Sequence, residues 1–162
     1  MMNYMANDED LSELDKMLLL IINFSGSVKA TRLQKLGILG NVALGHNHDS
    51  IHNPYYFGGF SDEIEEESTF LHEQGYLRQT PGGLVLSPTG VKCVEELKNK
   101  NEKEATTIKG IVETLRRYSD KEVTAITYKM FPDLADKSII REEVDKISQR
   151  LPIIELEYKD DE

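Results

Sequence analysis

Three histidines stand close together at a spacing that is compatible with metal binding. They are His46, His48 and His52, and Asp49 lies between them. Zinc accepts imidazole ligands, and alternate side chains on an extended segment point to the same side. The segment offers no fourth ligand at a familiar spacing, because the single cysteine, Cys93, lies far along the chain inside a predicted helix. We therefore expect a structural or incidental role for the histidines and predict neither a metal site nor a cofactor.

Acidic residues are concentrated in FGGFSDEIEEE, residues 57–67. We expect a helix over residues 61–74, in which the outward-facing acids are Asp62, Glu63, Glu66 and Glu67. Five acids in the six positions 62–67 would repel the phosphates of a nucleic acid. Two interpretations stay open. The acids form a docking surface for a basic protein partner, or they form a solvated face whose first residues favour the positive end of the helix.

A second set of charged residues suggests contacts with phosphate. Lys29, Arg32 and Lys35 recur at about one-turn spacing on a predicted helix, so they can share one face. The other candidates for nucleic-acid contact are Arg78, Arg116 and Arg117. The alternative is that these are ordinary solvated residues that pair with nearby acids.

Residues for catalysis are not evident in the sequence. We find no paired carboxylates placed for acid–base chemistry, no nucleophile with an adjacent base and no glycine-rich phosphate loop. We therefore expect a protein that is not an enzyme.

The overall charge argues against a conventional nucleic-acid binder. The 162 residues include 19 Lys and Arg and 29 Asp and Glu, for a net charge of −10. Such a chain repels a polyanion unless its bases gather on one face. The longest apolar run, residues 17–22, is too short to cross a bilayer, so we expect no membrane partner. One cysteine and an acidic N-terminus without a signal-peptide pattern predict a cytoplasmic protein.

The order of the predicted elements defines the expected fold. Apolar periodicity and capping residues predict a helix that begins after Asp10 or Ser12, a second that begins after Ser27 or Lys29, and the acidic third helix. Residues 76–86 predict a hairpin around Pro-Gly-Gly, and Ser87-Pro88 begins a further helix. We expect Gly37 and Gly40 to weaken the second helix. This order is that of a winged helix-turn-helix within a mainly helical α+β fold, with the acidic third helix in the position of a recognition helix.

The domain boundaries follow from the change to purely helical patterns after residue 98. We predict a winged-helix domain over residues 1–98 and a helical extension over 104–152 that folds back on it or forms a dimer interface. Residues 153–162 predict a short strand and an acidic tail.

Several short motifs resemble a family of prokaryotic winged-helix proteins that includes the Panacea-type antitoxin domains. The motifs are TRLQKL (31–36), YYFGGFSDEI (55–64), GYL (75–77), LSPTG (86–90) and ITYKMFPDLADKS (126–138). One departure is that Gly59 stands where the family usually has proline. The resemblance implies a winged-helix fold and a non-catalytic protein, because antitoxin members bind and neutralise protein partners. It implies no shared catalytic residues.

Two functions are therefore expected from the sequence. The first is a dimeric transcriptional regulator that touches DNA through the second helix, the hairpin and Arg116/Arg117 rather than through the third helix. The second is a protein-interaction module of antitoxin or adaptor type that uses the acidic third helix against a basic partner.

Overall fold

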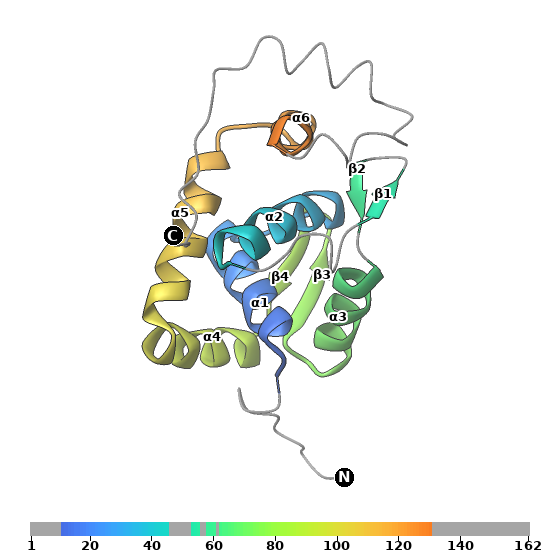
Figure 1. The fold of residues 1–162 in the computed structure, drawn as a ribbon. Helices are drawn as coiled ribbons and strands as arrows, with labels where there is room; N and C mark the ends of the chain where they lie inside the picture. The colour runs from blue at the N-terminus through green and yellow to red at the C-terminus, as the bar shows by residue number, and fades with distance from the viewer. Residues whose placement is uncertain (1–10, 46–52, 56–57, 61, 131–162) are drawn as a thin grey trace.

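The computed structural model describes residues 11–45, 53–55, 58–60 and 62–130. These residues form a mainly helical structure with two small antiparallel sheets of two strands each (Figure 1). The elements are α1 (Glu13–Ser25), α2 (Ala30–Ala43), β1 (Asn53–Tyr55), β2 (Gly58–Phe60), α3 (Asp62–Glu73), β3 (Leu77–Thr80), β4 (Gly83–Leu86), α4 (Pro88–Lys100), α5 (Glu102–Leu115) and α6 (Asp120–Met130).

The helices begin at the capping residues that the sequence predicts. The Ser12 hydroxyl accepts a hydrogen bond from the Asp15 amide, and the Asp15 carboxylate accepts one from the Ser12 amide, each at 3.0 Å. The same reciprocal box joins Ser119 and Glu122 at the start of α6. Each box satisfies amide groups that have no partner in the first turn of a helix. Three helix boundaries, those at α1, α4 and α6, are thus set by local sequence.

Helix α1 is the centre of the hydrophobic core. Residues 17–22 are all buried, so α1 is covered on every side rather than along one stripe. Figure 1 shows α4 and α5 on one side of α1 and α3 on the other. Ile108, Ile111 and Leu115 of α5 belong to the same continuous core. Helix α6 packs against α2.

Helix α2 runs seven residues further than the predicted stretch that ends at Leu36. The expectation that Gly37 and Gly40 weaken this helix is wrong. A Cβ atom on Gly37 would lie 2.6 Å from Ile64 Cδ1 of α3, and one on Gly40 would lie 3.0 Å from Ile108 Cδ1 of α5. The missing side chains let neighbouring helices approach α2 closely, and this packing offsets the low helix propensity of glycine.

The predicted hairpin is present as β3 and β4. Leu77 pairs with Leu86 and Thr80 pairs with Gly83, with residues 81–82 forming the turn. A third segment joins the hairpin, because Val28 exchanges two backbone hydrogen bonds with Leu84, at 3.0 and 2.8 Å. The connection between α1 and α2 is therefore tied to the outer edge of β4.

The hairpin leads into α4 through a tight corner. The Ser87 amide donates to the Tyr76 carbonyl over 3.0 Å, and the Ser87 hydroxyl donates to the Gly75 carbonyl. A Cβ atom on Gly90 would collide with the Tyr76 carbonyl oxygen. The final glycine of the LSPTG motif is thus required by close packing of backbone on helix.

Some sequence predictions fall outside the described residues. They are the part of the predicted helical extension after residue 130, the strand and tail over 153–162, and the three histidines at 46, 48 and 52. The described residues within 41–60 contain the end of α2 and the paired strands β1 and β2.

Candidate functional site

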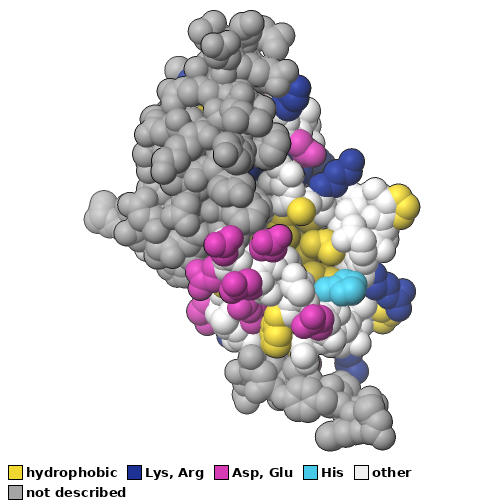
Figure 2. All heavy atoms as spheres, turned by 90° about the vertical axis from the view of Figure 1, so that its right-hand side faces the viewer, with side chains coloured by type: hydrophobic (Ala, Val, Ile, Leu, Met, Phe, Trp, Pro, Cys, Tyr) yellow, Lys and Arg dark blue, Asp and Glu magenta, His cyan; other side chains and the backbone are white. Residues whose placement is uncertain are grey.

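The exposed face of α3 carries a group of carboxylates. Ile64 and Leu71, seven residues apart, are the buried positions of α3, so the acids between and before them face outward. Asp62, Glu63 and Glu66 are exposed, as the sequence predicts, and Glu67 is partly buried. Figure 2 shows acidic side chains gathered on this face, with lysines and arginines only at its margins.

Among the described residues, these carboxylates have no basic ion-pair partner. The three described ion pairs lie elsewhere, between Lys16 and Glu13, Arg32 and Asp120, and Lys98 and Glu95. The face therefore keeps its negative charge and attracts a cationic surface.

Glu67 differs from its neighbours because it faces a second carboxyl group. A hydrogen bond with Asp15 of α1 raises the pKa of Glu67 from 4.5 to about 7, with further contributions from burial and from the negative charges of Asp15, Glu63 and Glu66. Asp15 is only 2% exposed, and its Oδ1 has no donor among the described residues. When protonated, Glu67 can donate to Asp15, so charge on this part of α3 changes near neutral pH.

The six basic residues proposed for nucleic-acid contact do not form one exposed stripe. Lys35 is 2% exposed, contrary to the solvated face that its spacing with Lys29 and Arg32 predicts. Burial lowers the pKa of Lys35 from 10.5 to about 8. Lys29, at the start of α2, is exposed. The helical period is right, but α3, α5 and α6 cover much of α2.

Arg32 is occupied by contacts within the protein. Its guanidinium donates to the carbonyl oxygens of Leu115, at 2.7 Å, and Tyr118, at 2.8 Å. It also forms an ion pair with Asp120 at 2.9 Å. These acceptors lie at the end of α5, where carbonyl groups lack helical partners, and at the beginning of α6.

Three further arginines lie at the surface. Arg116 is exposed but donates to the Phe24 carbonyl at the end of α1. Arg117 is exposed, donates to the Tyr118 hydroxyl over 3.2 Å and lies over the Tyr118 ring. Arg78 is exposed on β3. The structure thus brings Arg32 and Arg116 together at one pocket, whereas Arg78 is on the hairpin.

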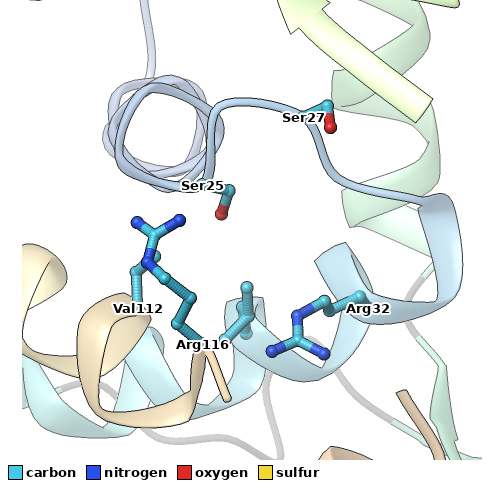
Figure 3. A pocket seen from close by; sticks show the side chains of 6 residues that line it. Ser25, Ser27, Arg32, Val112 and Arg116 are labelled. Atoms are coloured by element: carbon cyan, nitrogen blue, oxygen red, sulfur yellow. The ribbon is translucent and has the colours of Figure 1, made fainter. Parts of the chain in front are cut away.

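Arg32 and Arg116 line a small pocket of about 140 Å³ between α1, α2 and the end of α5 (Figure 3). Its other lining residues are Ser25, Ser27, Leu36 and Val112. The two serines were not identified from the sequence. Ser25 is the last residue of α1 and Ser27 lies in the short connection after it, where serine is common for conformational reasons alone, so no sequence signal singles them out.

Neither a metal cluster nor a membrane helix is found where the structure is described. Residues 11–45, 53–55, 58–60 and 62–130 contain no group of three His, Cys, Asp or Glu side chains that could hold a metal ion. None of the helices in the same ranges has both the length and the apolar character that a bilayer crossing requires.

No protein-family model, curated protein or solved structure matches the chain.

Proposed function

We propose that the chain is a winged-helix protein that binds a basic protein partner through the exposed face of α3. The element order supports this fold. Helix α1, the Val28 segment, α2, α3, the hairpin β3–β4 and α4 follow one another as in a winged helix, with the hairpin as the wing and α3 in the recognition position. In this proposal the role is that of an antitoxin or adaptor rather than an enzyme.

The observation that carries the proposal is the contrast between the two charged sets. The α3 carboxylates are exposed and have no ion pairs in the described residues, so their charge is available to a partner. Of the bases, Lys35 is buried and Arg32 donates to Leu115, Tyr118 and Asp120. A helix with this charge in the recognition position opposes DNA phosphates and favours a cationic protein surface.

A second candidate function is DNA binding through the outer face of the wing. Side chains alternate across a strand, so the exposed Arg78 lies opposite to the buried Leu77 on β3. Val28 is buried against β4 and the next residue, Lys29, is exposed. With Arg116 and Arg117, these two cations are the exposed members of the predicted DNA set, and they can supply a weak regulator-type contact. A homodimer stays a prediction for either function.

Charge reversal on α3 tests the first function. A protein that co-purifies with the chain from its own source would be purified, and its affinity measured for wild type and for Glu63→Lys/Glu66→Lys. We expect at least about a tenfold loss, because steering by complementary charge contributes about 10- to 1,000-fold to association rates. The control is Glu102→Lys/Glu113→Lys, which makes the same change of charge at exposed positions of α5.

Equal affinity of the two double variants for the partner would overturn the partner proposal.

The DNA candidate has its own test, retardation of random duplex DNA at low salt. Lys29→Glu/Arg78→Glu is the suitable variant, because charge reversal at Arg32 or Lys35 would also disrupt the fold. DNA binding would be the favoured function if wild type retards DNA and Lys29→Glu/Arg78→Glu does not, and if charge reversal on α3 leaves partner binding unchanged.

A further inference from the structure

The pocket between α1, α2 and α5 has the composition of an anion site. Two arginines from different helices line it, and two serines, at the end of α1 and in the connection after it, complete its polar wall. Figure 3 shows Ser25 between the two arginine side chains, with its hydroxyl directed toward the space that separates them. We propose that this pocket binds a small phosphate-type oxyanion, held by Arg32 and Arg116 with help from Ser25 and Ser27.

The arginines have donors left for a ligand. A guanidinium has five N–H groups. Arg32 makes three hydrogen bonds, to Leu115, Tyr118 and Asp120, which leaves two of the five within the described structure. Arg116 makes one, to Phe24, which leaves four. The protein contacts hold each guanidinium in place, so little side-chain freedom is lost when an oxyanion accepts the remaining donors.

Ser25 supplies an independent observation. Its Oγ is inaccessible to water and has no hydrogen-bond partner in the described part of the chain. A buried hydroxyl without a partner is destabilising, so a serine at this position needs a reason. Rotation of the Ser25 side chain about χ1 would expose this hydroxyl to the pocket, where a phosphate oxygen would accept its proton, and the exposed Ser27 can donate from the other side of the connection.

The local charge and the size of the pocket favour a small anion. Two guanidinium groups are opposed by one carboxylate, that of Asp120. Leu36 and Val112 form an apolar part of the wall, which strengthens charge-assisted hydrogen bonds at the site. A volume of about 140 Å³ accommodates a phosphate group, which needs the space of a few water molecules, but not a nucleobase with its sugar. The pocket is separate from the acidic face of α3.

Inorganic phosphate is the probe for the test. Its dissociation constant would be measured by NMR titration and by the rise in Tm, against sodium chloride at equal ionic strength. We expect saturable binding by wild type and an unchanged dissociation constant for Arg117→Gln. Arg116→Gln should raise the constant by at least about tenfold, because it removes a charged donor. The two variants make the same change of charge at neighbouring exposed positions, so only Arg116 tests the pocket.

Ser25→Ala distinguishes a binding site from arginines that only stabilise the fold. Without phosphate this variant should be as stable as wild type or slightly more so, because it removes an unsatisfied hydroxyl. With phosphate it should bind roughly two- to tenfold more weakly. The proposal is overturned if wild type shows no difference between phosphate and chloride, or if Arg116→Gln and Ser25→Ala bind phosphate like wild type. It is also overturned if short duplex DNA, but not inorganic phosphate, binds in an Arg116-dependent way.

Discussion

The guanidinium of Arg32 on α2 lies 2.7 Å from the carbonyl oxygen of Leu115, 83 residues later at the end of α5. The same side chain reaches the Tyr118 carbonyl and Asp120. One residue of the TRLQKL motif therefore connects α2 to the turn between α5 and α6. A cation there also interacts favourably with the negative end of α5.

Replacing Arg32 with alanine is expected to destabilise the fold. The change leaves the Leu115 and Tyr118 carbonyls without this charged donor, and hydrogen bonds to charged groups contribute about 1.5–3 kcal/mol. Urea unfolding followed by circular dichroism measures the loss. Arg78→Ala, at an exposed position, should stay within about 0.5 kcal/mol of wild type. Equal losses for the two variants would show that the Arg32 contacts add nothing to stability.

Replacing either of two helical glycines with alanine should change stability, but in opposite directions. Gly90→Ala forces a Cβ atom against the Tyr76 carbonyl, and such overpacking costs about 1–3 kcal/mol or more. Gly110 of α5 has open space around its Cβ position, so Gly110→Ala should stabilise by about 0.5–1 kcal/mol through helix propensity. Thermal unfolding of the two variants gives the comparison. A stable Gly90→Ala protein would contradict the tight corner before α4.

Glu67 should make stability fall as pH rises toward neutrality. The hydrogen bond with Asp15, together with burial and nearby negative charges, raises the pKa of Glu67 in the folded protein from its ordinary value of 4.5 to about 7. Between these values the folded state binds more protons than the unfolded state, so this stabilisation is complete below pH 4.5 and is lost as pH rises through about 7.

The measurement for Glu67 is the free energy of unfolding across that window, compared with Glu67→Gln. The wild type should lose stability relative to the variant as pH increases. Glu65→Gln, at an exposed position on the same helix, is the matched control and should follow wild type. A difference between wild type and Glu67→Gln that does not change with pH would exclude a shared proton with Asp15.

Lys35 should have the opposite effect, so that stability increases with pH in the alkaline range. Burial lowers its pKa from 10.5 to about 8, so between these values the folded state has released a proton that the unfolded state retains. Stability therefore increases with pH across this window. In urea unfolding, the stability of wild type should increase relative to that of Lys35→Met as pH rises from about 8 to 10.5. Relative to Lys109→Met, a change at an exposed position, it should not increase in this way. If the difference in unfolding free energy between wild type and Lys35→Met did not change with pH, Lys35 would be solvated.

Most of the helices and the hairpin could be predicted from sequence because short-range rules set them. The capping boxes at Ser12 and Ser119, and the Ser87-Pro88 start of α4, each depend on residues within one turn. Asp62, Glu63 and Glu66 of α3 were also placed correctly, since Ile64 and Leu71 determine which face is buried, but the prediction for Glu67 was wrong because this side chain is partly buried against Asp15 of α1. The full length of α2 was missed because glycine propensity was outweighed by contacts with Ile64.

The amino-acid sequence by itself determined where the helices begin, where the hairpin turns and that α3 presents carboxylates outward, because these features depend on neighbours within a few residues. Only the tertiary structure decided which cations are available. Periodicity places Lys29, Arg32 and Lys35 near one another, but exposure depends on what packs over them. Helices α5 and α6, more than 65 residues downstream of this motif, cover that part of α2 and bring Arg116 to Ser25, and no local pattern contains that information.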